Sequence, residues 1–170
     1  MNESFIYPLN GLKAGRSTEK LHAGEEFFQS FGSTEILDAD LSVDVSVEKS
    51  GDFIGVDLDI KGWVEVICDR CLGRLRLPVE TSPSLSVKFG EQDDADDLRE
   101  GEREIVILPE SDTDLDLSQV VYDYVCISLP LKRVHASGGC DPDTVKYLGA
   151  GEQQTDVDDN NPFAALKGLL

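Results

Sequence analysis

The middle of the chain is organised by strict alternation of apolar and polar positions. Residues 41–49 alternate one by one, and residues 53–67 do so again after the Ser-Gly-Asp sequence at 50–52. A period of two is typical of a half-buried strand, and a Gly-Asp pair between two such runs signals a turn. The pattern therefore predicts an antiparallel hairpin, with Trp63 displaced past a bulge at Gly62. The apolar side of this hairpin is predicted to carry Leu41, Val43, Val45, Val47, Ile54, Val56, Leu58 and Ile60.

Further strand-like runs flank the hairpin. They cover residues 4–9, 74–80, 85–90 and 103–110, which predicts roughly five to seven strands in meanders, a usual size for one sheet. Residues 11–24 contain three glycines and no clean period, so they are predicted to be loop or irregular structure.

Two segments have helical features. Residues 25–31 predict a short helix that places Phe27, Phe28 and Phe31 on the core. Residues 116–129 are the stronger candidate, because Asp116 and Gln119 have the spacing of a capping box and Pro130 ends the helix. The apolar face of this helix is predicted to consist of Val120, Tyr124 and Ile127.

These elements predict an α+β fold. We expect a mainly antiparallel β meander or partly closed sheet, one or two packed helices and a candidate zinc-knuckle staple. Residues 1–148 are expected to form a single domain, in which 91–103 is an acidic mobile loop. A flexible acidic linker at 149–161 then leads to a short amphipathic helix at 162–170, which we expect to dock on its own domain, a twin or a partner.

Charge separates the chain into acidic and basic parts. The net charge is −19, and residues 91–116 contain twelve acidic and two basic residues. Such a field repels nucleic acid at long range and attracts basic proteins. The exceptions are two short basic stretches that carry Arg70, Arg74, Arg76, Lys132 and Arg133.

No apolar run is long enough for a transmembrane helix, and the first residues lack the basic and apolar regions of a secretory signal. We therefore expect a cytoplasmic protein without membrane association. Thiols stay reduced in that compartment, so free or metal-bound cysteines are expected rather than disulfides.

Cys68 and Cys71 have the two-residue gap that lets two thiolates bind one metal ion. His135 and Cys140, separated by four residues that include two glycines, supply a second pair 64 residues further along the chain. Together they make a Cys₃His set, which predicts a structural zinc site that joins a hairpin turn to the segment after the helix.

The Cys68–Cys71 pair is also compatible with a redox role or with plain reduced thiols on a basic turn. A redox pair needs a following helix whose N-terminus lowers a thiol pKa, but the residues after Cys71 are predicted to be a strand. Cys126, among apolar neighbours of the predicted helix, is interpreted as a buried thiol, and His22 as an ordinary surface residue.

No catalytic arrangement is apparent. The carboxylates come in runs, and no serine-centred elbow, P-loop or dinucleotide fingerprint occurs. A zinc site filled by four protein ligands also has no open position for a reacting water. We therefore do not expect an enzyme.

Three stretches resemble the YceD-like family of large ribosomal RNA subunit accumulation proteins. They are GWVEVICDRCLGRLRLPVE, ISLPLKRVHASGGC and the closing NPFAALKGLL, and the resemblance covers approximately residues 4–148 and the terminal helix. Family members often carry two cysteines after the Leu-Pro pair, and His135 stands where the first would fall. The resemblance implies support of large-subunit ribosomal RNA accumulation and no known enzyme activity.

Two function hypotheses follow. In the first, a non-enzymatic ribosome biogenesis factor contacts large-subunit ribosomal RNA, its precursor or basic ribosomal proteins through the metal-joined cluster of Arg70, Arg74, Arg76, Lys132 and Arg133. In the second, a protein–protein adaptor binds basic partners through the acidic loop and the C-terminal helix, without RNA contact. Its arginines would only neutralise thiolate charge near the metal.

Overall fold

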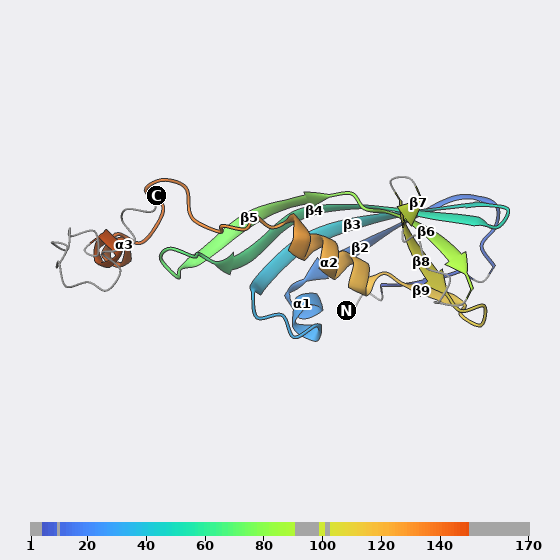
Figure 1. Ribbon diagram of the computed structural model, residues 1–170, viewed down its shortest axis with the longest axis horizontal. Helices are drawn as coiled ribbons and strands as arrows, with labels where there is room; N and C mark the ends of the chain where they lie inside the picture. The colour runs from blue at the N-terminus through green and yellow to red at the C-terminus, as the bar shows by residue number, and fades with distance from the viewer. Residues whose placement is uncertain (1–4, 10, 91–98, 101–102, 150–170) are drawn as a thin grey trace, which may run out of the picture.

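The computed structural model describes residues 5–9, 11–90, 99–100 and 103–149, and in this part the chain forms an α+β fold with an unclosed, mostly antiparallel sheet. Seven strands make the main sheet, in the order β2-β3-β4-β6-β8-β7 with β5 beside β4. The predicted fold class is therefore confirmed. Figure 1 shows the long strands β2 to β5 side by side, with β6, β8 and β9 toward one end and α3 beyond the other.

The predicted hairpin forms the centre of the sheet. Strands β3 (Ile36–Ser50) and β4 (Phe53–Ile67) pair antiparallel around a turn at Gly51, whose φ of 62° lies in the left-handed region that glycine tolerates. The apolar side predicted from the alternation is buried along its whole length. Burial of these β-branched and leucine side chains is the main force that fixes the register, since a one-residue slip would turn all of them to the other face.

The bulge predicted at Gly62 is wrong. The β3–β4 register runs without interruption through Gly62, and its shift lies between Ile36 and Asp38 instead. Gly62 has a φ of 150°, and a Cβ there would collide with the carbonyl oxygen of Asp40 on the neighbouring strand. The glycine is required by close approach of two backbones, so the strand continues past it and carries Trp63 onto the face opposite the core.

The loop predicted for residues 11–24 is also wrong over most of its length, because Gly15–Gly24 form strand β2 at the edge of the sheet. Only Leu21 and Ala23 are buried in this strand, while ten residues pair with β3. Backbone pairing with a long neighbour holds β2 in place, and an edge strand needs few apolar residues, so its alternation is invisible in the sequence.

Strand β4 also pairs with two strands on its other side. Residues Ile60–Ile67 pair with β5 (Arg74–Thr81), and Ile54–Asp57 pair with β6 (Ser84–Phe89). Strand β6 in turn pairs in parallel with β8 (Arg103–Leu108), which departs from a simple meander. The predicted acidic loop at 91–103 lies mostly outside the described residues, but Arg99–Glu100 form the short strand β7 beside β8.

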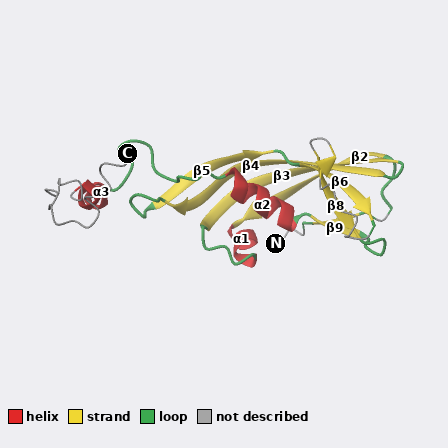
Figure 2. Cartoon of the chain, viewed as in Figure 1, coloured by secondary structure: helices red, strands yellow, loops and turns green. Residues whose placement is uncertain are grey.

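Two helices cover the apolar face of the sheet (Figure 2). The predicted short helix is α1 (Glu25–Ser30), with Phe28 fully buried. Helix α2 (Ser118–Ser128) contacts it through Tyr122, whose ring stacks on Phe31 at a centroid distance of 4.6 Å. The core therefore lies between the sheet and this pair of helices.

Helix α2 differs from its prediction in two respects. The predicted apolar face is wrong, because Val121 and Val125 are buried whereas Ile127 is 76% exposed. The capping box is wrong as well, since Gln119 bonds to Asp123 and Asp116 accepts the backbone N–H of Ser118. The buried stripe consists of Leu117, Val121 and Val125, spaced four residues apart, and lies one position away from the predicted one.

The remaining elements lie at the two ends of the fold. Strand β1 (Ile6–Pro8) pairs with β9 (Asp114–Asp116) just before α2. Pro130 ends α2 as predicted, with Leu129 in the extended conformation that precedes a proline. A further helix, α3 (Pro142–Gly149), was not predicted. The predicted linker at 149–161 and helix at 162–170 lie outside the described residues, apart from Gly149, which ends α3.

Candidate metal centre

The turn after β4 holds the first two cysteines. The backbone N–H of Cys68 donates to the carbonyl of Gly73 at 2.8 Å, and that of Leu72 donates back to Cys68 at 2.9 Å. These bonds close residues 68–73 into a tight knuckle, within which Cys68 and Cys71 are buried. Leu72 completes the turn with a φ of 56°, the one positive φ of a non-glycine residue in the described part of the chain.

The segment after α2 holds the other two candidate ligands, and it is bonded directly to the knuckle. Asp69 donates its backbone N–H to the carbonyl of Arg133 at 2.7 Å, and its carboxylate accepts the backbone N–H of Arg133 at 2.6 Å. Two residues later His135 turns toward the cysteines, and a turn closed by the N–H of Gly139 on the carbonyl of Ala136 leads to Cys140.

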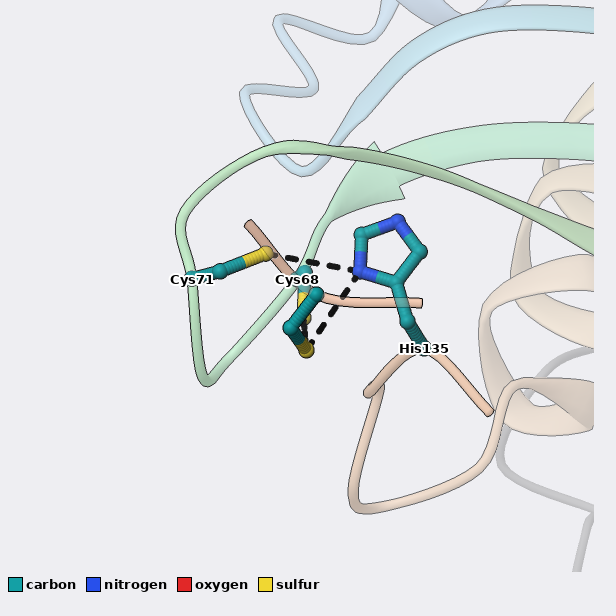
Figure 3. Close-up of side chains that lie close together, drawn as sticks. Cys68, Cys71 and His135 are labelled. Carbon is teal, nitrogen blue, oxygen red and sulfur yellow. Dashed lines mark hydrogen bonds between the residues drawn. The ribbon is translucent and has the colours of Figure 1, made fainter. Parts of the chain in front are cut away.

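All four predicted ligands come together. Cys68, Cys71, His135 and Cys140 offer one atom each, and these four atoms lie within 4.8 Å of one another. The Sγ of Cys71 is 3.4 Å from Nδ1 of His135, that of Cys140 is 3.7 Å from the same nitrogen, and the Sγ atoms of Cys68 and Cys140 are 3.9 Å apart. Figure 3 shows the two knuckle cysteines and His135 pointing toward one another.

These separations fit a tetrahedral metal ion. Metal–ligand bonds of about 2.3 Å to sulfur and about 2.05 Å to nitrogen predict ligand–ligand distances of about 3.8 Å and about 3.6 Å. A disulfide is excluded between Cys68 and Cys140, because their sulfurs are 3.9 Å apart, against about 2.05 Å in a bond. The cluster could therefore bind a metal ion.

His135 is oriented for coordination by its second nitrogen. Its Nε2 lies 3.0 Å from the backbone carbonyl of Arg74, which can only accept, so Nε2 carries the proton. The lone pair is then on Nδ1, the nitrogen that faces the thiols. A histidine ligand whose other N–H donates to a carbonyl is the usual arrangement in metal sites, because the bond fixes both the tautomer and the ring orientation.

Two glycines leave room for this packing. A Cβ at Gly73 would lie 3.5 Å from the Sγ of Cys71, and one at Gly139 would lie 3.1 Å from the Cβ of His135. The first contact is ordinary and the second is tight. The glycine at 139 therefore lets the backbone approach the imidazole.

The backbone favours ionised thiols in the knuckle. Burial raises the pKa of Cys68, but backbone N–H groups of Cys71, Arg70 and His135 outweigh burial and lower it to about 6. Hydrogen bonds from the backbone of Asp141 and Gly73 lower the pKa of Cys71. Burial raises the pKa of Cys140, and the bond to the Arg74 carbonyl raises that of His135. Two easily formed thiolates provide the negative charge that a divalent cation requires.

The fourth cysteine and the second histidine lie apart from this cluster. Cys126 is half-buried against the core, and burial raises the pKa of its thiol. His22 is exposed on β2 and lies 2.9 Å from a carboxylate oxygen of Asp40. The interpretation of His22 as a surface residue agrees with its position, whereas Cys126 is less buried than the sequence interpretation expected.

The five predicted cationic residues lie at the knuckle end of the sheet, but they are not equally available. Arg70 and Lys132 are exposed and have no ion pair within the described residues. Arg133 is only 24% exposed, and its guanidinium bonds to Glu35 at 2.9 Å. That arginine therefore joins the segment after α2 to the residue preceding β3, while the remaining two arginines share a partner.

Glu65 is the shared partner of Arg74 and Arg76, at 2.6 Å and 3.3 Å. The hydrogen bond from Arg74, followed by that from Arg76, holds the pKa of this buried carboxyl below its usual range against the effect of burial. Alternation along two paired strands places all three residues on the face opposite the core. The alternation itself is visible in the sequence, but the register of β4 against β5, which makes Glu65 the neighbour of both arginines, is not.

The start of α3 beside the cluster is a second feature that the sequence analysis missed. Asp141 accepts the backbone N–H of Thr144 at 3.1 Å and the hydroxyl of Thr144 at 2.6 Å. Asp at the cap followed by Pro142 at the first helical position is a recognisable helix start. The sequence Asp-Pro-Asp-Thr directly after Cys140 could have predicted it.

Comparison with known proteins gives a family. No curated protein and no solved structure matches the chain.

No helix in the described part of the chain has the length and apolar character needed to span a membrane. The model of the family described as large ribosomal RNA subunit accumulation protein YceD matches residues 56–170, which is more than half of the chain and includes all four clustered residues. The chain therefore belongs to the YceD family of large ribosomal RNA subunit accumulation proteins.

Proposed function

We propose that this protein is a non-enzymatic ribosome biogenesis factor that binds a structural zinc ion and contacts large-subunit ribosomal RNA or its precursor with the knuckle end of its sheet. The observation that carries the proposal is the convergence of four ligand atoms from two segments 64 residues apart in sequence. The family name supports the role in large-subunit ribosomal RNA accumulation.

Zinc is favoured over other metals by the ligands. Three thiolates and one imidazole are a donor set that Zn²⁺ takes in structural sites, and the four ligand atoms here lie within 4.8 Å of one another. Four protein ligands leave no open position for a water, so the ion supplies stability rather than chemistry. Closing a long loop restricts the unfolded chain, and the binding free energy of the ion adds to folding.

Charge at the knuckle supports RNA contact. Arg70 and Lys132 come from the two segments that the cluster joins, and both are exposed. They stand on a protein of net charge −19, which disfavours binding of RNA elsewhere on its surface. A small cationic end on an anionic body would bind phosphates in one orientation, with an affinity that falls as salt rises.

The metal is tested by elemental analysis of protein purified without chelator. We expect about one zinc per chain in the parent and none in a Cys68→Ser, Cys71→Ser variant. Cys126→Ser is the matched control, because that thiol lies outside the cluster. A parent protein without zinc, or a double variant that retains it, contradicts the proposal.

The RNA contact is tested by co-sedimentation with large-subunit precursors. Arg70→Glu with Lys132→Glu should lower co-sedimentation without breaking an ion pair of the described structure. The control is Lys13→Glu, an exposed charge reversal beside the far end of β2. Unchanged co-sedimentation of the double variant contradicts the RNA contact.

The adaptor hypothesis depends on residues 91–102 and 162–170, most of which lie outside the described residues. It predicts that partner binding is lost when the acids of 91–102 are replaced by neutral residues. Replacement is preferable to deletion, because parallel strands β6 and β8 need a crossover connection between them. Retained binding in this variant favours the RNA contact.

A further inference from the structure

The sheet has a polar face, opposite the helices, that carries an ordered group of side chains on β4 and β5. Trp63 and Glu65 are two residues apart on β4, so their side chains lie on the same face. Arg74 and Arg76 of β5 lie on that face too, with Arg76 directly opposite Glu65. No described helix covers this face, because α1 and α2 both pack on the apolar side and α3 lies beyond the end of the sheet. The group is therefore presented to solvent by two paired strands, a rigid support.

The guanidinium of Arg76 lies over the indole ring of Trp63, with its central carbon 4.0 Å from the ring centroid. Its Nε bonds to Glu65 at 3.3 Å, so the planar group is held from below by the ring and at its edge by the carboxylate. The Arg76 side chain is nevertheless 62% exposed. One face of the guanidinium is thus occupied by tryptophan while the side chain stays open to solvent.

Acidic and basic side chains of this face stand on different strands. Glu65 is the single acid that bonds both Arg74 and Arg76, and its side chain is only 9% exposed. In the register, Asp38 and Asp40 of β3 lie opposite Glu65 and Trp63, so acids border the group on that side. Both cations are on β5, which pairs with β4 alone. The Arg74 side chain is 71% exposed and uses one nitrogen for Glu65, so further N–H donors remain.

We propose that this group, Trp63–Arg76 with Arg74, binds an unpaired nucleotide of RNA. The base stacks on the exposed plane of Arg76, and Arg74 donates to the adjoining phosphate. The proposal rests on the proposed function and deepens it, because it names single-stranded RNA as the class of ligand and extends the contact from the knuckle onto the start of β5 beside it.

Physical chemistry favours an unpaired base over the alternatives. Guanidinium planes and aromatic rings are the platforms on which splayed bases stack, whereas a duplex hides its base faces and exposes phosphates. An acidic protein segment would pair with the N–H edges of the two arginines, part of which Glu65 already occupies, and would leave the plane of Arg76 unused. Stacking on the Arg76 guanidinium, the platform of this site, makes no hydrogen bond to the edge of the base, so little sequence preference is expected.

A purely structural role for the same contact makes a different prediction. Arg76 could simply cover the tryptophan ring with its side chain. In that case Arg76→Lys would alter stability slightly and leave RNA binding unchanged. RNA-binding measurements on Arg76→Lys therefore separate the two roles, because this variant keeps the positive charge but loses the planar guanidinium.

Trp63 is the one tryptophan of the chain, so its fluorescence reports on this site alone. Titration of the full chain with a short single-stranded oligoadenylate RNA should give a saturable change in tryptophan emission. The same length of RNA in a duplex should bind much more weakly. No saturable change, or equal affinity for the duplex, overturns the proposal.

The variants are compared by fluorescence anisotropy of labelled RNA, which does not require the tryptophan. Arg76→Lys and Trp63→Leu should each weaken binding about tenfold, the scale of one lost stacking contact, while Trp63→Phe should retain most of the affinity. The matched control is Arg16→Lys, on the same polar face but on β2, where Arg16 bonds to Ser46 at 2.6 Å. Equal affinity of Arg76→Lys and the parent overturns the platform, and this variant remains decisive if Trp63→Leu fails to fold.

Failure of this proposal can be distinguished from failure of the proposed function. If the full chain co-sediments with large-subunit precursors but Arg76→Lys and the parent bind oligoadenylate equally, the platform is wrong and the biogenesis role stands. If the chain binds neither precursors nor the single-stranded probe, both are wrong.

Discussion

Asp69 and Arg133 exchange two hydrogen bonds across 64 residues of sequence, at 2.7 Å and 2.6 Å. These bonds join the knuckle turn to the segment after α2 without involving any candidate ligand. The chain itself therefore brings the two halves of the cluster together, and a metal ion would complete an arrangement that is already close to its final geometry.

The first prediction concerns the histidine ligand. His135→Cys should still bind zinc, because Cys₄ is as good a tetrahedral set as Cys₃His, whereas His135→Ala should weaken zinc binding by at least about a hundredfold. Competition with a coloured chelator measures both affinities. His22→Ala, outside the cluster, is the control, and parent-like affinity in His135→Ala would show that the imidazole is not a ligand.

The second prediction is that Leu72→Gly stabilises the protein. Leu72 has a φ of 56° and is 73% exposed, so its side chain adds strain and little burial. Removing the Cβ relieves about 1–2 kcal/mol, against about 0.4–1 kcal/mol of added entropy in the unfolded chain. Urea denaturation of zinc-loaded protein should therefore show a net gain of about 0.5–1 kcal/mol.

Leu131→Gly is the control for this gain. Leu131 is exposed as well but does not have a positive φ, so its replacement by glycine should not stabilise the fold. Equal effects of the two substitutions would show that backbone strain at Leu72 is negligible.

The third prediction concerns Gly62. A Cβ there would collide with the Asp40 carbonyl, and the backbone cannot move aside without breaking the β3–β4 ladder. Gly62→Ala should cost about 3 kcal/mol or more in thermal or urea unfolding. In Gly11→Ala the φ of 80° is unfavourable too, but nothing lies within 4 Å, so that variant isolates the conformational cost from the collision. If both variants lose the same stability, close approach of the strands is not the reason for the glycine.

The fourth prediction tests which face of α2 is packed. Val121→Ala should cost about 2 kcal/mol, because it removes fully buried methyl groups. Ile127→Ala should change stability by less than about 0.5 kcal/mol, because the isoleucine is largely exposed. A larger loss of stability in Ile127→Ala than in Val121→Ala would show that the face predicted from the sequence pattern is the packed one.

The fifth prediction is a pH dependence at Glu65. Its pKa is lowered in the folded protein, chiefly by the hydrogen bond from Arg74. A carboxyl with a depressed folded pKa stabilises the fold above its unfolded pKa, and this contribution is lost as pH falls through the folded value. The stability difference between the parent and Glu65→Gln should thus be full at neutral pH and shrink below the ordinary glutamate range. A difference that stays constant down to acid pH contradicts the Arg74 and Arg76 pairing.

The parts of the fold that could be predicted are those in which burial alone decides the structure. Leu41 to Val47 and Ile54 to Ile60 must face the core, so alternation was sufficient to predict the central hairpin. The edge strand β2 is held by backbone pairing. In α2 the apolar pairs Val120–Val121 and Tyr124–Val125 allow two adjacent faces, of which the one with Val121 and Val125 is buried. The pattern is therefore weak in β2 and ambiguous in α2, and both were predicted incorrectly.

The candidate site shows the same division. Residue type and spacing were enough to select Cys68, Cys71, His135 and Cys140, because few side chains bind metals and their chemistry is local. The ion pairs of the nearby arginines could not be predicted from residue type and spacing. Pairing of Arg133 with Glu35 and of two arginines with Glu65 depends on which strands are neighbours, and that relationship is long-range in sequence.

The pairing of β1 with β9 has a consequence for synthesis of the chain. Ile6 lies opposite Asp116, so the first described strand emerges from the ribosome well before its partner is made. At typical translation speeds this delay is on the order of ten seconds. During that time the buried Phe5 and Leu9 have no completed core to enter, so this segment can dock only after residues 114–117 have been made.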